Sequence, residues 1–193
     1  MSKLFVDEIV HQSSQGSGTI TIGASGETIS VPSGVSMSVP SGGLSGQNYP
    51  AFEAYASSDQ TGLGDAVWTK LTIDSELFDT DSNFASSRFT PTTAGKYFVY
   101  LMLGMNSETL YKANVFNVSI YKNGSAYRTT NTTVNAGASD IMNEHNATVS
   151  AIIDFNGSSD YVEGYTRVNV TSGTGRVDIR AGSGGFGAYR IGA

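Results

Sequence analysis

The feature that most constrains the fold is a succession of short alternating segments from Tyr49 to the end of the chain. Each segment tends to alternate polar and apolar residues, the period of a half-buried strand. Turn sequences separate the segments, among them Asn123-Gly124 and Asn156-Gly157, and Asn-Gly is typical of a two-residue β-hairpin. Because no long amphipathic helical pattern is present, these segments predict an all-β antiparallel fold, either a two-sheet β-sandwich or a jelly roll. We expect strands at residues 51–56, 66–73, 78–84, 88–91, 96–106, 115–122, 126–133, 148–156, 161–170, 176–181 and 185–191.

The composition agrees with a β-rich chain that has one ordinary domain and a tail. Its 193 residues are 39% hydrophobic and 15% charged, and they include 23 glycines. The formal net charge of −6 argues against nucleic acid as a partner, since that binding needs a positive surface. No apolar run approaches the roughly 18 residues of a membrane span, so we expect no membrane insertion. The chain has no cysteine, which excludes disulfides, thiolate nucleophiles and cysteine-bound metals.

The N-terminal residues 1–18 have the pattern of a docking segment followed by a linker. An apolar patch comes first, and residues 12–18 are a Gly/Ser/Gln stretch typical of flexible linkers. An apolar peptide on such a tether is typical of a docking element, and the alternative is a disordered terminus. Asp7 and Glu8 interrupt the apolar run, so we expect no signal peptide and synthesis in a cytoplasm. The docking residues are expected to be Leu4, Phe5, Val6, Ile9 and Val10.

Residues 19–46 contain a short repeat. The sequence Ile-Ser-Val-Pro-Ser-Gly at residues 29–34 returns as Met-Ser-Val-Pro-Ser-Gly at residues 37–42. One copy buries too little apolar surface to offset the ordering of its backbone, which costs about 1–2 kcal/mol per residue. Three copies wound about an axis bury these apolar rows together, which favours a trimeric β-repeat stalk over the alternative of a mobile polar linker. The stalk residues are expected to be Ile20, Ile22, Ile29, Val31, Met37 and Val39.

The expected strand at residues 96–106 is apolar on both faces, since its residues 97–105 read YFVYLMLGM. A strand of this kind has to be covered on both sides. The opposite sheet covers one side. For the other side we favour a neighbouring subunit, and the alternative is cover by loops of the same chain.

The chain lacks the residue constellations of an enzyme, and we predict no catalytic residues and no cofactor. His11 lies in the tail, and His145 is expected to be an exposed residue of a polar loop, so neither supports a catalytic triad. Asp79 and Asp81 are a weak calcium candidate, since they offer oxygen ligands at alternate positions without the rest of a calcium loop. Lectin-like binding surfaces use exposed aromatic side chains, and packing is the favoured role for each candidate here. Those candidates are Tyr49, Trp68, Tyr111, Tyr127 and Tyr161.

Three stretches resemble the C1q/TNF-like jelly-roll family: PAFEAYAS at residues 50–57, SSRFTPTTAGKYFVYLML at 86–103 and GGFGAYRIGA at 184–193. In the second, four residues match the family pattern in spacing, whereas Pro91 comes one position early and Val99 replaces an aromatic residue. The resemblance implies a jelly-roll head over residues 47–193 and a homotrimer. Together with the two-sided strand, it places the head core or trimer interface at Phe52, Phe89, Tyr97, Phe98, Tyr100, Phe186 and Tyr189.

The layout as a whole resembles virion proteins of tailed bacteriophages, which join a start such as LFVDEIV and repeats such as TITIG and ETISVPSG to a β-rich head. This resemblance implies a virion structural protein, a homotrimeric fibre or capsid decoration. Its N-terminus would dock on the major capsid protein or another virion protein. The alternative is a receptor-binding adhesin, or tail fibre, whose head binds a host surface glycan or protein.

Overall fold

The computed structural model describes residues 33–34, 48–109, 112–133, 144–179 and 182–192. The chain divides into two units, Met1–Leu44 and Ser45–Ala193, and the second, called the head below, contains every strand described here. The expected docking residues of segment 1–18 and the expected stalk residues of segment 19–46 lie outside the described residues. Within the described part of the chain, no helix is long and apolar enough to cross a bilayer.

The head is built from strands that pair only antiparallel. In chain order they are β1 (Ala51–Tyr55), β2 (Gln60–Leu63), β3 (Thr69–Lys70), β4 (Ser75–Asp79), β5 (Phe84–Ala85), β6 (Arg88–Phe89), β7 (Gly95–Ser107), β8 (Ala113–Lys122), β9 (Ser125–Thr133), β10 (Glu144–Phe155), β11 (Val162–Val170), β12 (Gly175–Asp178) and β13 (Gly185–Gly192). They form two sheets, as an antiparallel sandwich requires.

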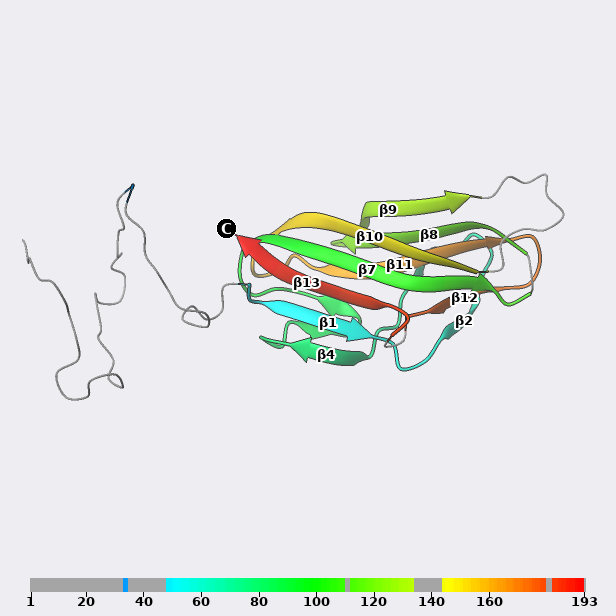
Figure 1. Ribbon diagram of the computed structural model, residues 1–193, viewed down its shortest axis with the longest axis horizontal. Coiled ribbons are helices and arrows are strands. Elements are labelled where there is room, and N and C mark those ends of the chain that lie inside the picture. Colours follow the sequence, from blue (N-terminus) through cyan, green and yellow to red (C-terminus); the bar gives the residue numbers. More distant parts are fainter. Residues whose placement is uncertain (1–32, 35–47, 110–111, 134–143, 180–181, 193) are drawn as a thin grey trace, which may run out of the picture. The chain divides into compact units, whose positions relative to one another are not determined.

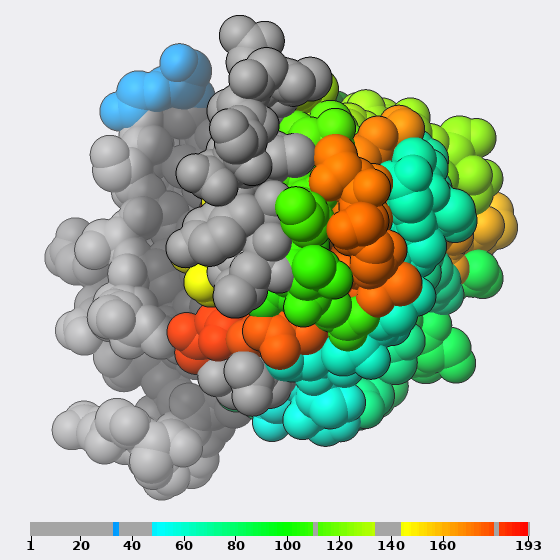
Figure 2. Space-filling view, turned by 90° about the vertical axis from the view of Figure 1, so that its right-hand side faces the viewer, coloured from blue at the N-terminus to red at the C-terminus, as the bar shows by residue number. Residues whose placement is uncertain are grey.

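Sheet A has seven strands and is organised around β7 (Figure 1). One edge of β7 pairs with β10 along twelve residue pairs, from Gly95↔Phe155 to Asn106↔Glu144. The other edge pairs first with β13 and then with β12. β1 follows β13 and β4 follows β1, while β2 pairs with β12. Figure 2 views the end of the head where β12 (orange) lies between β7 (green) and β2 (teal).

Sheet B has six strands in the order β5-β6-β11-β8-β9, with β3 also paired to β11. Its centre is the antiparallel pair of β8 and β11, which runs from Lys122↔Val162 to Ala113↔Val170. β3 and β6 occupy successive parts of the other edge of β11, since Lys70 is opposite Tyr165 and Arg88 is opposite Glu163. Side chains 70, 88 and 163, far apart in the sequence, are therefore brought together on one sheet.

The core lies between the two sheets and follows from strand alternation. Every second residue of β7 points inward and is at most 1% exposed, namely Tyr97, Val99, Leu101, Leu103 and Met105. An aromatic cluster fills the end of the sandwich nearest β1. The ring of Phe52 stacks on Phe84 and Phe89 at centroid distances of 4.7 and 4.4 Å, and it meets Phe186 edge-on at 5.2 Å. Such pairs contribute about 0.5–1.5 kcal/mol each beyond their buried area.

β9 and β10 close one side of the sandwich through side chains. The hydroxyl of Tyr127 donates to the carbonyl of Ile152 at 3.2 Å, and the hydroxyl of Thr130 donates to the carbonyl of Thr148 at 3.2 Å. These bonds satisfy carbonyl groups on the edge of β10 that does not pair with β7, so the edge is not open for pairing along its whole length. These side-chain bonds link sheet B to sheet A at this side.

The prediction that His145 is an exposed loop residue is wrong. His145 lies in β10, which begins at Glu144, and it is half-buried. Its ring stacks on Phe116 with centroids 5.9 Å apart, and its Nε2 lies 2.9 Å from the hydroxyl of Thr132. The physical reason is strand parity: His145 has the same parity as the inward-facing Ala147, so it points between the sheets despite its polar sequence neighbours.

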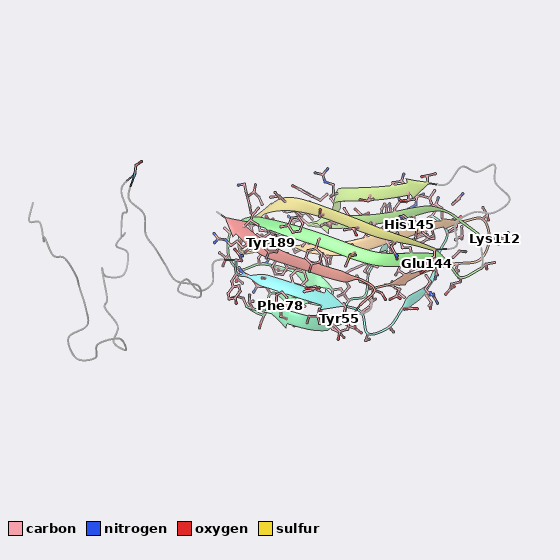
Figure 3. All side chains as sticks on the ribbon, viewed as in Figure 1. Tyr55, Phe78, Lys112, Glu144, His145 and Tyr189 are labelled. Carbon is pink, nitrogen blue, oxygen red and sulfur yellow. The ribbon has the colours of Figure 1, made fainter. Side chains whose placement is uncertain are left out.

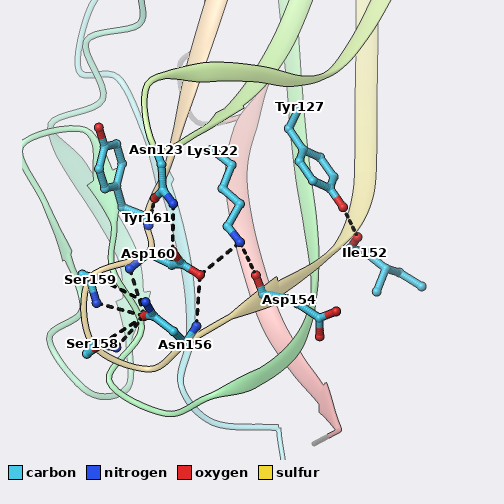
Figure 4. A network of polar contacts seen from close by, with 10 residues as sticks. All are labelled: Lys122, Asn123, Tyr127, Ile152, Asp154, Asn156, Ser158, Ser159, Asp160 and Tyr161. Atoms are coloured by element: carbon cyan, nitrogen blue, oxygen red, sulfur yellow. Dashed lines mark hydrogen bonds and ion pairs between the residues drawn. The ribbon is translucent and has the colours of Figure 1, made fainter.

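Two hairpin turns hold each other at the end of the sandwich formed by the β8–β9 and β10–β11 connections (Figure 4). The side-chain oxygen of Asn156 accepts the backbone N–H groups of Ser158, Ser159 and Asp160, each at 3.0 Å. The Asp160 carboxylate in turn accepts the Asn123 side-chain amide at 2.8 Å and lies 3.0 Å from the Lys122 ammonium. Both turns carry the Asn-Gly pairs of the sequence, and the Asp160 carboxylate joins them.

Candidate functional site

The main candidate site is an apolar patch on the outer surface of sheet A. Because residues directly opposite each other in a sheet share a face, the register defines the patch. Tyr189 of β13 and Ile152 of β10 flank Phe98 of β7 in one row, and Met102 and Tyr100 occupy the next outward positions of β7. We call this set the apolar face. It consists of Phe98, Tyr100, Met102, Ile152 and Tyr189.

The apolar face is uncovered by the described residues. Ile152 is 57% exposed, Met102 is 44% exposed and Tyr189 is 41% exposed, while Phe98 and Tyr100 are half-buried. The ring of Phe98 lies 5.6 Å from that of Tyr189, so these side chains form a continuous surface across β7 and β13. Figure 3 shows Tyr189 on β13, the strand between β7 and β1. A contiguous exposed aromatic surface is typical of a protein–protein interface.

Tyr100 lies flat across β13 because Gly187 has no side chain. A Cβ at residue 187 would lie 2.5 Å from the Tyr100 ring and hydroxyl, closer than any packed contact. Burial, the negative charge of Glu53 and a hydrogen bond with Glu53 raise the pKa of Tyr100 to about 12. The Tyr100 phenol therefore stays neutral at physiological pH. Its hydrogen-bond partner Glu53 is a polar group at the margin of the apolar face.

The seven residues that sequence reasoning placed in the head core or trimer interface fall into two groups. Four are 0–1% exposed and belong to the core: Phe52, Phe89, Tyr97 and Phe186. The other three, Phe98, Tyr100 and Tyr189, belong to the apolar face. Sequence reasoning missed Met102 and Ile152. Met102 could have been predicted, because it lies two residues after Tyr100 in the same strand and so faces the same side. Ile152 could not, because in the adjacent pair Ile152-Ile153 the sequence does not show which side chain points outward.

Asp79 and Asp81, the weak calcium candidate, both accept hydrogen bonds from residues close to them in the chain. Asp79 accepts the backbone N–H of Phe84 at 2.7 Å, and Asp81 accepts the hydroxyl of Thr80 at 2.6 Å. Both carboxylates therefore serve as acceptors within their own loop. Across the described ranges, no group of three or more His, Asp or Glu side chains is arranged to hold a metal ion.

A second candidate site lies on sheet B, where two cations share one buried carboxylate. Oε1 of Glu163 lies 2.7 Å from Nζ of Lys70 and 2.9 Å from both Nε and Nη2 of Arg88. The Glu163 side chain is 4% exposed. Burial alone would raise the pKa of Glu163, but the hydrogen bonds and charges of Lys70 and Arg88 outweigh it and lower the pKa below 4.5. Glu163 is thus ionised at neutral pH.

The aromatic residues considered for ligand binding have mixed surroundings. The ring of Tyr161 lies under the Arg88 guanidinium, 3.8 Å from its central carbon, and Trp68 packs on Tyr121 at 5.9 Å. Tyr127 is 46% exposed, and its hydroxyl donates a hydrogen bond to the carbonyl of Ile152 in β10. Tyr49 is 50% exposed. Tyr111 lies outside the described residues. Among the described members of this set, Tyr161 is the one that contacts a cation of sheet B, Arg88.

No protein-family model and no curated protein matches the chain. Solved structures do match. Eiger TNF from S. frugiperda aligns with a TM-score of 0.56 at 9% sequence identity, over 75% of this chain and 93% of that one. Murine APRIL, solved at pH 5.0, aligns with a TM-score of 0.49 at 8% identity, over 73% of this chain and 98% of that one. The likeness to Eiger TNF is a likeness of fold, and it confirms the expected all-β TNF-like jelly roll for the head.

Proposed function

We propose that this chain is a homotrimeric structural protein of a phage virion, a fibre or a capsid decoration, whose jelly-roll head projects from the particle. The observation that carries the trimer is the apolar face, with three side chains more than 40% exposed on one continuous sheet surface. Other copies of the chain are the proposed cover. This choice is supported by the two-sided apolar strand at residues 96–106 and by the family resemblance of the sequence, which implies a homotrimer.

The virion role is supported by the sequence of residues 1–46. The apolar N-terminal patch and its polar linker suit attachment to a particle, and the repeated Val-Pro-Ser-Gly units suit a short trimeric stalk. In this arrangement trimerisation increases the number of docking peptides per assembly to three. Weak individual contacts then combine into durable attachment through effective concentration.

Sedimentation velocity of the full chain tests the trimer. We expect one species of three times the 20.3 kDa subunit mass at micromolar concentration. Ile152→Glu or Met102→Glu should convert it to folded monomers, because each places charge in an interface while the residue is exposed in the subunit. Val67→Glu is the matched control, since Val67 is 54% exposed in the loop between β2 and β3, off the apolar face.

A wild-type chain that sediments as a monomer would reject the trimer, as would variants that change nothing at the apolar face. The virion role has its own test. Deletion of residues 1–18 should abolish co-sedimentation with the parent particle and leave the trimer intact. A truncated chain that still binds the particle would show that residues 1–18 are not the anchor.

The alternative role, a receptor-binding adhesin, uses the same trimer and adds a ligand-binding surface on the head. The observation that favours this alternative is the cation pair Lys70 and Arg88 on sheet B. Because the apolar face belongs to sheet A, a trimer contact through that face leaves the cation pair available to a ligand.

A further inference from the structure

A hollow of about 500 Å³ opens beside the cation pair of sheet B. Lys70 and Arg88 line it together with Ser82, Asn83, Ala85, Ser86, Thr90 and Thr92. The shape of the hollow depends on backbone conformation as well as on side chains. Ser82 and Ser86 have positive φ angles of 55° and 53°, so the loop bends sharply around it.

The two cations are held in fixed positions. The Glu163 carboxylate forms ion pairs with both cations, and the Arg88 guanidinium also lies over the Tyr161 ring. Nζ of Lys70 donates in addition to the carbonyl of Ser86 at 3.1 Å, which ties the cation to the loop. Preorganised donors lose little conformational entropy when a ligand binds, and a stacked arginine is among the most preorganised.

The charges do not balance within this group. Two cations meet one carboxylate, which leaves one positive charge in excess among Lys70, Arg88 and Glu163. The side chains of Lys70 and Arg88 are still 35% and 43% exposed, although Glu163 is only 4% exposed. A guanidinium has five N–H donors in a planar fork, and Glu163 engages only the Nε and Nη2 side. The Nη1 side therefore has donors for a second planar acceptor such as a carboxylate.

The rest of the lining is mostly polar. Asn83 is 8% exposed, and its side-chain oxygen accepts the backbone N–H of Thr92 at 2.7 Å. Its side-chain amide donates to the carbonyl of Asp81 at 2.8 Å, which fixes the loop at its other end. The hydroxyl-bearing residues Ser82, Ser86, Thr90 and Thr92 also line the hollow, together with Ala85. Hydroxyl groups that both donate and accept suit the hydroxyls of a sugar ring.

We propose that this hollow binds an acidic saccharide, with the sugar carboxylate on Arg88 and Lys70 and the ring hydroxyls on the Ser and Thr side chains of the lining. The inference goes beyond the trimer and names the ligand class that the adhesin alternative requires. It does not depend on oligomerisation, because the hollow belongs to the sheet B side of the head and the apolar face to sheet A.

A nuclear magnetic resonance titration of the full chain tests the proposal, with glucuronate as the probe and glucose as its neutral counterpart. We expect saturable shifts at Lys70, Ser86 and Arg88 with glucuronate and none with glucose. Arg88→Gln should weaken glucuronate binding about tenfold, because the sugar carboxylate loses a charge-assisted hydrogen bond. Glu163 keeps Lys70 as its partner in this variant, and Lys70→Gln is the reciprocal variant that keeps Arg88.

Lys96→Gln is the matched control, because it removes the same charge from a lysine that is 52% exposed and paired with Asp154 outside the hollow. It should leave the affinity for glucuronate within about twofold. Absence of saturable shifts, equal binding of glucose, or equal loss in Lys96→Gln would each overturn the proposal. Binding of inorganic sulfate without binding of glucuronate would also overturn it. Sedimentation of Arg88→Gln should match the wild type, so failure here and failure of the trimer are distinguishable.

Discussion

The hydroxyl of Ser87 bridges both backbone groups of Ile73: it accepts the Ile73 N–H at 2.8 Å and donates to the Ile73 carbonyl at 3.0 Å. Ser87 sits in the tight turn between β5 and β6 with a φ of 59°, a conformation that L-residues rarely adopt. Ser87 is 9% exposed and Ile73 is 2% exposed. The Ser87 hydroxyl therefore satisfies the buried backbone groups of Ile73, as a neighbouring strand does elsewhere in a sheet.

Ser87→Ala should destabilise the head by about 1–3 kcal/mol, because the buried N–H of Ile73 loses its acceptor. The midpoint of urea denaturation at matched protein concentration measures the change. Ser86→Gly is the contrasting variant: residue 86 has a φ of 53°, which glycine adopts without strain, so its midpoint should not fall. A Ser87→Ala midpoint equal to that of the wild type would show that water replaces the hydroxyl.

Gly157→Ala should be among the most damaging small substitutions. Residue 157 has a φ of 70°, and a Cβ there would lie 2.4 Å from the backbone nitrogen of Ala94. The neighbour is main chain, so the clash cannot be relieved by a side-chain rotation. Gly62→Ala is the control, since it shares the positive φ of 68° but has open space around a Cβ.

We expect Gly62→Ala to cost about 1–2 kcal/mol, the penalty of the left-handed conformation alone, and Gly157→Ala to cost clearly more. Urea denaturation of both variants gives the comparison. Equal midpoints would show that the turn at residue 157 moves away from Ala94 without penalty.

The stability of the head should decrease in acid. The pKa of Glu163 is lowered in the folded state by Lys70 and Arg88, and that of Asp160 is lowered by hydrogen bonds from Asn123 and Lys122. A lowered folded pKa means that the ionised form favours folding. This contribution is present above the unfolded pKa and is lost as the pH falls below about 4.5.

Thermal unfolding between pH 7 and pH 3 measures this loss. Glu163→Gln should lower the melting temperature at neutral pH, because two cations lose their buried partner, and it should reduce the decline below pH 4.5. Asp154→Asn is the comparison variant, as the Asp154 side chain is 72% exposed. A decline in Glu163→Gln as steep as that of the wild type would rule out Glu163 as its source.

Tyr97 and Tyr100 should ionise late in alkaline titration. Burial raises the pKa of Tyr97 to about 12, and burial together with Glu53 raises that of Tyr100 to about 12. Because a raised folded pKa favours the neutral phenol, the stability from these groups is present below pH 10 and is lost as the pH rises towards 12. Phenolate absorbance should show a late phase that becomes smaller in Tyr97→Phe and again in Tyr100→Phe. A single phase at the ordinary pKa of 10 would contradict the burial of both phenols.

Local pattern predicted much of the head. A continuous apolar run predicted the central strand at residues 96–106, which the structure has as β7 (Gly95–Ser107), and the Asn-Gly pair at 123–124 predicted the hairpin between β8 and β9. Where local signals were weak, strand boundaries were wrong. A single strand was expected at residues 66–73, whereas the structure has β2 (Gln60–Leu63) and β3 (Thr69–Lys70). The Gln60 side chain pairs with the backbone of Lys70 and Thr72 there, a contact that alternation does not encode.

The sequence by itself determined the periodic features of this protein: its all-β class, its central two-sided strand and its main turns, because each depends on residues close together in the chain. Only the tertiary structure decided which residues meet across strands. Strand pairing placed Ile152 beside Phe98, turned His145 inward, and brought Lys70 and Arg88 to Glu163 from 93 and 75 residues away. These relationships depend on register and on which face each strand presents, and register is set by the packing of the whole sandwich.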